Sequence, residues 1–207
     1  VSNQAGKSNL LKILNESGIE IEKNDDRLYR ILEEIKEKED NGYTFDVAGA
    51  SFEIFARKKL GLMPHFFSVN RYKVTMEKKD NVEHKFQIIS EAVVSINLGN
   101  QERISIAESL DNNGQDQGPV HALSAALRKD LGPYQSFIKD MKLVDFKVRI
   151  MNGGTEAITR VLIDSEDKNG LRWSTIGVSA NIIDASYDAI IDSINWKLLK
   201  EKATPVQ

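Results

Sequence analysis

One order of hydrophobic patterns occurs twice in this chain of 207 residues. In each copy, three segments with apolar residues at every second position are followed by a segment with the helical repeat. The two copies cover about residues 66–132 and 142–200. A three-stranded meander with one apolar face is stabilised when a helix covers that face. The repeat therefore predicts an α+β fold with two βββα units, each an antiparallel meander covered by its own helix.

In the first copy, the third alternating segment constrains the position of a charged side chain. Ile104 and Ile106 are expected to face the core, which places Glu108 in the same inward phase. An unpaired carboxylate is costly there, so Glu108 is expected to meet an ammonium group, a nearby arginine or a backbone donor. A helix is predicted to begin at Gly118-Pro119, because proline is favourable at a first helical position.

In the second copy, Asn181 is expected to start a helix that runs to about Leu199. Trp173 lies in the last predicted strand and Trp196 in this helix. Large aromatic side chains of this kind usually pack in a core or an interface. We expect both tryptophans to be structural.

The first part of the chain, residues 1–65, has helical periodicity and is predicted to be a helical linker before a domain of residues 66–207. One amphipathic helix is expected around four apolar residues at helical spacing, Leu28, Ile31, Leu32 and Ile35. Gly6-Lys7-Ser8 is not predicted to bind phosphate, because Val1 stands where the phosphate loop needs a glycine. The basic run 57–59 is interpreted as a favourable charge set at a helix C-terminus.

Charge and composition argue against several classes of protein. The formal charge is −3 and spread evenly, so no basic surface for nucleic acid is expected, and the helix start at Gly118 lacks the lysines of a double-stranded-RNA-binding domain. No apolar run is long enough to cross a membrane. The chain has no cysteine and three isolated histidines, which predicts a cytoplasmic protein without a metal site. It begins without methionine or a signal-peptide pattern, so it is expected to be a piece of a longer protein, with a processed protein as the alternative.

Several segments carry a resemblance to a known family. They are Gly118-Pro119-Val120-His121-Ala122-Leu123, Trp173-Ser174-Thr175-Ile176-Gly177-Val178-Ser179 and Asn181-Ile182-Ile183-Asp184-Ala185-Ser186. Together they resemble the C-terminal regulatory domain of the isopropylmalate synthase and citramalate synthase family. Residues 2–9 and 42–53 are similar to the linker of the citramalate branch.

The resemblance implies where catalysis takes place. Enzymes of this family condense acetyl-CoA with a 2-oxo acid on a TIM barrel that holds a divalent metal with a His-x-His pair and an aspartate. That barrel would precede Val1, and the pair is missing from this chain. We therefore expect a non-catalytic fragment without a cofactor.

The resemblance also implies a branched-chain amino acid as effector, bound in a homodimer. Isoleucine is expected if the parent makes citramalate, and leucine if it makes isopropylmalate. The helix starts at Gly118 and Asn181 offer free N–H groups to a carboxylate, and small apolar residues beside them offer walls for the side chain. The residues predicted to bind the effector are Glu108, Gly118, Pro119, Val120, His121, Ala122, Asn181, Ile182, Ile183 and Ala185.

Two features of the sequence allow more than one interpretation. Each predicted site residue also fits a structural role, such as helix entrance or core, so a dimerisation scaffold without a ligand is an alternative. Residues 109–117 lengthen the approach to Gly118 relative to the family pattern, as a longer strand or as a flap over the pocket.

Overall fold

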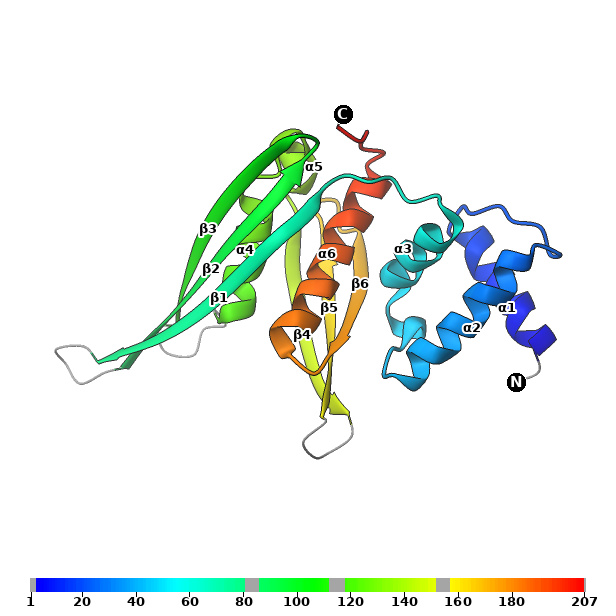
Figure 1. Cartoon of the computed structure of the whole chain (residues 1–207), viewed down its shortest axis with the longest axis horizontal. Coiled ribbons are helices and arrows are strands. Elements are labelled where there is room, and N and C mark those ends of the chain that lie inside the picture. Colours follow the sequence, from blue (N-terminus) through cyan, green and yellow to red (C-terminus); the bar gives the residue numbers. More distant parts are fainter. Residues whose placement is uncertain (1–2, 81–85, 112–117, 152–156, 207) are drawn as a thin grey trace. The chain divides into compact units, whose positions relative to one another are not determined.

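The computed structural model describes residues 3–80, 86–111, 118–151 and 157–206 (Figure 1). The predicted α+β class is confirmed: two three-stranded antiparallel sheets are each followed by helices. The described helices and strands are, in chain order, α1 (Asn3–Glu16), α2 (Asp26–Asp40), η1 (Phe45–Val47), α3 (Gly49–Leu60), β1 (Ser68–Asp80), β2 (Phe86–Leu98), β3 (Gln101–Asp111), α4 (Pro119–Lys129), η2 (Gly132–Tyr134), α5 (Gln135–Ile138), β4 (Lys142–Met151), β5 (Ile158–Glu166), β6 (Arg172–Ser179) and α6 (Ile182–Lys200).

The chain forms two compact units that do not follow the sequence continuously. The β4–β6 unit consists of residues 1–63 and 142–196, and the β1–β3 unit consists of residues 64–141 and 197–207. Helices α1, α2 and α3 therefore share a unit with the second sheet, although the whole first sheet lies between them in sequence.

In the β1–β3 unit, α4 packs along one face of a sheet with strand order β1-β2-β3 (Figure 1). The covered face carries the predicted apolar stripe of β2, and Ala92, Val94 and Ile96 are fully buried. Arg103 of β3 pairs with the carboxylate of Asp130 just beyond α4, with a nitrogen to oxygen distance of 2.8 Å.

The predicted phase of β3 is wrong. Ser105 pairs with the buried Val94 and is itself buried, so the helix-covered face contains Ser105 and not its neighbours. Ile104 and Ile106 are 57% and 48% exposed, and Glu108 is exposed with them. Small residues occupy the inner phase because α4 packs closely there, whereas the isoleucines lie on the open face.

In the β4–β6 unit, the two faces of the sheet contact different helices. On one face α6 packs over β5 and β6, and Trp173 stacks on Trp196 with ring centroids 5.3 Å apart. Both tryptophans are buried, as expected. On the other face, Ile176 joins an apolar cluster made by α1, α2, η1 and α3. The four predicted α2 residues, Leu28, Ile31, Leu32 and Ile35, are all buried in this cluster.

Candidate functional site

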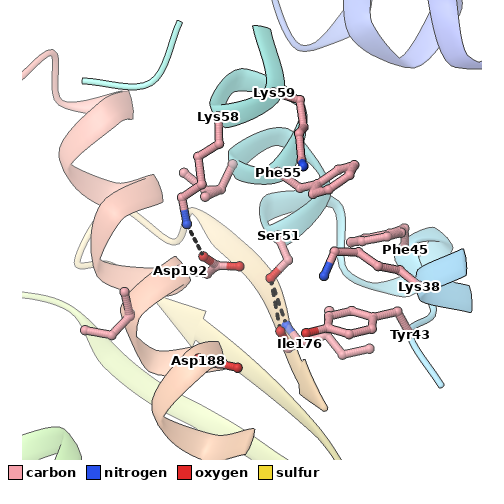
Figure 2. Close-up of a pocket in the computed structure, with 12 residues that line it drawn as sticks. Lys38, Tyr43, Phe45, Ser51, Phe55, Lys58, Lys59, Ile176, Asp188 and Asp192 are labelled. Carbon is pink, nitrogen blue, oxygen red and sulfur yellow. Dashed lines mark hydrogen bonds and ion pairs between the residues drawn. The ribbon is translucent and has the colours of Figure 1, made fainter. Parts of the chain in front are cut away.

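The β4–β6 unit contains a cavity of 380 Å³ between α3, the end of α2, β6 and α6 (Figure 2). Its walls combine apolar, basic and acidic side chains. They are Lys38, Tyr43, Phe45, Ser51, Ile54, Phe55, Lys58, Lys59, Ile176, Asp188, Ile191 and Asp192.

Helix α3 forms one wall because polar contacts fix it to the edge of the sheet. Strand β6 is an edge strand, and the Ile176 N–H donates to the Ser51 hydroxyl oxygen at 3.0 Å. Two residues along, Glu53 is buried and accepts from the indole N–H of Trp196 at 2.8 Å. Arg57 binds the other carboxylate oxygen of Glu53 at 2.9 Å. These contacts satisfy buried backbone and side-chain groups that would otherwise be costly.

The opposite wall carries two acidic side chains at a helical spacing of four on α6. Asp192 lies 3.5 Å from the ammonium group of Lys58. Burial raises the pKa of Asp192 above its ordinary value, although the charge of Lys58 and a hydrogen bond with Ser51 act in the opposite direction.

Asp188 lines the same cavity and remains accessible to solvent. Surrounding protein atoms raise the pKa of Asp188 to about 6, with the charges of Asp184 and Asp192 adding to the effect. Among the residues that the structure describes, the Asp188 carboxylate has no hydrogen bond and no ion pair. Its carboxylate is directed into the cavity (Figure 2).

Two aromatic rings hold a basic side chain at the third side of the cavity. The Lys38 ammonium group lies 4.3 Å from the ring centroid of Tyr43 and 5.6 Å from that of Phe55. These are cation–π distances. Burial and the negative charges of Asp188 and Asp192 raise the pKa of Tyr43 to about 12, so its hydroxyl stays protonated. Lys59, by contrast, forms an ion pair with Glu34.

The basic run at the end of α3 thus has more specific contacts than the predicted favourable charge set at a helix C-terminus. Arg57, Lys58 and Lys59 each have an acidic partner, on α3, α6 and α2 respectively. The cavity itself was not predicted. One signal was present, because Asp184, Asp188 and Asp192 recur every fourth residue and must share one face of a helix.

Six predicted effector residues fall in the β1–β3 unit. Gly118 is the N-cap residue of α4, in extended conformation and without a side-chain hydrogen bond to the helix start. Pro119 is the first helical residue and Val120 is half-buried. His121 is exposed, whereas Ala122 is fully buried against the sheet. Glu108 lies on the open face described above.

The other four predicted residues fall in the β4–β6 unit. The Asn181 side-chain oxygen accepts from the backbone N–H groups of Ile183 and Asp184, at 2.8 and 3.4 Å, so it already caps α6. Ile182 is exposed, Ile183 is half-buried and Ala185 is fully buried. A Cβ on Gly177 would lie 1.8 Å from the carbonyl oxygen of Ala185, so this glycine is what lets α6 approach β6.

The described residues contain no group of three or more acidic or histidine side chains arranged to hold a metal ion. Within the same residues, every helix is too short or too polar to span a bilayer.

Comparison with known proteins identifies the family. Residues 46–198 match the model of the LeuA allosteric (dimerisation) domain. The chain belongs to this family. The matched range runs from η1 to α6, so this LeuA allosteric domain includes both sheets and the α3 wall of the cavity.

Among curated relatives, the chain is 41% identical to an (R)-citramalate synthase from Geobacter sulfurreducens and 40% identical to one from Aquifex aeolicus. Each match covers 98% of this chain and 37% of the relative. A probable 2-isopropylmalate synthase from Archaeoglobus fulgidus is 24% identical over 96% of this chain and 35% of its own length. The chain thus spans little more than a third of the length of these relatives.

Proposed function

We propose that this chain is the regulatory domain of an acetyl-CoA-dependent (R)-citramalate synthase that binds isoleucine as feedback inhibitor. The observation that carries the proposal is the pattern of similarity. Five relatives with that name are 33 to 41% identical to the chain over 96 to 100% of its length. The probable 2-isopropylmalate synthase, matched over a similar range, is only 24% identical.

The proposed effector site uses the starts of α4 and α6 in a homodimer. At α4 the N-cap residue is Gly118, the following Pro119 has no N–H and the His121 N–H donates to the Gly118 carbonyl oxygen, so the Val120 N–H is the first-turn donor left without a side-chain acceptor. Such a turn attracts a carboxylate through its N–H groups and the helix dipole. At α6 the turn is capped by Asn181, so an effector there would contact Asn181 and the exposed Ile182 rather than a free turn.

Catalysis belongs, in this proposal, to the part of the relatives that the chain does not cover. The parent would use a divalent metal and acetyl-CoA in the cytoplasm, and the chain itself would need neither as cofactor. Purified chain incubated with acetyl-CoA, pyruvate and magnesium or manganese should form no citramalate. Turnover by the chain alone would contradict this part of the proposal.

Two other functions make different predictions. A leucine-sensing domain of a 2-isopropylmalate synthase would bind leucine in preference to isoleucine. A dimerisation scaffold would bind neither. Pocket shape must provide the discrimination, because one displaced methyl group changes binding by only about 1 to 3 kcal/mol.

A thermal-shift screen with the twenty amino acids tests the proposal. A ligand at 100 times its Kd stabilises the folded state by about 2.7 kcal/mol, which is readily seen as a higher Tm. We expect isoleucine to give the largest shift. A larger shift with leucine would assign the chain to the isopropylmalate branch. No shift with any amino acid would indicate a dimerisation scaffold without a ligand.

A further inference from the structure

We propose that the cavity between α2, α3, β6 and α6 binds a free α-amino acid with an aliphatic side chain. This site lies wholly within one unit of one chain, and it is separate from the effector site proposed at the helix starts. It therefore goes beyond the feedback function proposed above.

The cavity offers one unpaired cation and one unpaired anion. Most charged groups around it neutralise one another, since Lys58 pairs with Asp192 and Lys59 with Glu34. Lys38 and Asp188 are different: within the described residues, the side chain of neither forms a hydrogen bond or an ion pair. Figure 2 shows the Lys38 nitrogen and an Asp188 oxygen directed into the same space from its two sides.

The Lys38 charge is held in place by aromatic rings, and the Asp188 charge is carried by a closely packed helix. Lys38 lies over the rings of Tyr43 and Phe55, which favours a fixed position of its ammonium group. Asp188 belongs to α6, whose backbone packs against β6 at Gly177. Pre-positioned charges lower the ordering cost of binding.

Most of the remaining lining of the cavity is apolar. Ile54, Ile176 and Ile191 line the cavity together with Phe45 and Phe55. The volume of 380 Å³ lies near the lower end of the range of about 300 to 1,000 Å³ typical of small-molecule sites. A small ligand with an aliphatic group matches this size and lining.

A zwitterion fits this set of charges better than a simple ion does. An inorganic anion bound at Lys38 would face the carboxylates of Asp188 and Asp192, and a simple cation bound at Asp188 would face Lys38 and Lys58. An α-amino acid presents a carboxylate to Lys38, an ammonium group to Asp188 and its side chain to the isoleucines. Such a ligand would connect α2 with α6.

The test combines calorimetry with methyl NMR on the purified chain, with isoleucine, leucine and valine as probes. Lys38→Gln and Asp188→Asn each remove one charge of the cavity. Lys36→Gln, on the same helix but outside the lining, is the matched control. Gly118→Asp reports on the helix-start site. Isoleucine methyl resonances of Ile54, Ile176 and Ile191 report directly on the cavity wall.

We expect at least one of the three probes to shift these methyl resonances, and its affinity in the cavity to fall at least tenfold in Lys38→Gln and in Asp188→Asn. Lys36→Gln and Gly118→Asp should keep that binding. Unchanged methyl resonances with all three probes, or unchanged affinity in both cavity variants, would overturn the inference. Binding that only Gly118→Asp abolishes would support the proposed feedback site while excluding this one. Binding lost only in Lys38→Gln and Asp188→Asn would support the cavity site and exclude the proposed feedback site.

Discussion

The indole N–H of Trp196 donates to the carboxylate of Glu53 at 2.8 Å, across 143 residues of sequence. Glu53 belongs to α3 and Trp196 to α6, so this hydrogen bond joins the first and last segments of the β4–β6 unit. Arg57 binds the same carboxylate and also donates to the carbonyl oxygen of Ser17. A single buried acidic side chain therefore holds three segments together.

Replacing that acidic side chain should destabilise the fold. Glu53→Ala removes one acceptor from the mostly buried guanidinium of Arg57 and one from the indole N–H of Trp196, at a cost of about 2 to 3 kcal/mol in the free energy of unfolding. Glu53→Gln keeps an acceptor for Trp196 and should lose less. Urea unfolding measured by circular dichroism compares the two variants. Equal stability of Glu53→Ala and the parent would show that the contact contributes nothing.

A second variant tests the close approach of α6 to β6. In Gly177→Ala, the new Cβ would lie 1.8 Å from the carbonyl oxygen of Ala185, so helix and strand must move apart. Overpacking against backbone cannot be relieved by a rotamer change, and we expect a loss of about 3 kcal/mol or more. Gly49→Ala is the control, because a Cβ there meets no atom within 4 Å. A melting temperature of Gly177→Ala close to that of the control would refute the contact.

The raised pKa of Asp188 makes stability depend on pH. Its folded-state value of about 6 exceeds the ordinary 3.8, so the charged form destabilises the fold above pH 6 and this penalty disappears as the pH falls toward 4. Asp188→Asn should therefore raise the free energy of unfolding at pH 7 by about 1 kcal/mol, a value reduced because Asp188 is accessible to solvent.

The control for this prediction is the pH series itself. Lys38, Lys58, Tyr43, Tyr187, Asp184 and Asp192 are the charged and titratable groups that act on Asp188. They remain in both proteins, so the difference between variant and parent isolates Asp188. Urea unfolding at pH 4, 5, 6, 7 and 8 should show the advantage of Asp188→Asn shrinking below pH 6. A constant difference across the series would contradict the raised pKa.

Gly118→Asp tests the proposed effector site at α4. The backbone at Gly118 has an ordinary extended conformation, and a Cβ there meets no atom within 4 Å, so the fold accepts the change. Aspartate at an N-cap takes the free N–H groups itself, which slightly stabilises the helix while repelling a ligand carboxylate. We expect isoleucine binding at the helix starts to be abolished in calorimetry, with melting temperature and dimer retained. Gly118→Ala, which adds no charge, should keep measurable binding.

The open face of the first sheet offers a test of the homodimer. Ile104 and Ile106 are exposed side by side on β3, and Leu110 follows on the same face at 40% exposed. Changing both isoleucines to aspartate places two charges in any interface that uses this face, so sedimentation at tens of micromolar should shift toward monomer. Leu62→Asp changes another exposed apolar residue, outside the sheets, and serves as control. A double variant that stays dimeric would show that the dimer interface uses another surface.

The sequence predicted the order of helices and strands because that order depends on periodicity. A buried stripe such as Leu28, Ile31, Leu32 and Ile35 has one structural solution on a helix, and the structure confirms it. The alternating stripe of β2 is equally constrained, since Ala92, Val94 and Ile96 must share one face.

Strand β3 shows where such patterns stop being decisive. Its alternation places Ile104 with Ile106, as predicted, but it does not determine which face the helix covers. Close packing of α4 selected the small side chains instead. The cavity could not be predicted from hydrophobic periodicity for another reason. Lys38 and Asp188 are 150 positions apart, and only the packing of α2 and α3 against the second sheet brings them together.

That packing also sets the order in which the chain is completed during synthesis. Helices α1 to α3 are synthesised before the whole first sheet, whereas their partners β6 and α6 are synthesised after it. Contacts that close such long loops slow folding, and an apolar face exposed in the meantime promotes aggregation. The β1–β3 unit, whose sheet and α4 are contiguous, has most of its residues available earlier. A nascent chain that stops short of Trp196 therefore lacks the indole N–H that donates to Glu53 of α3.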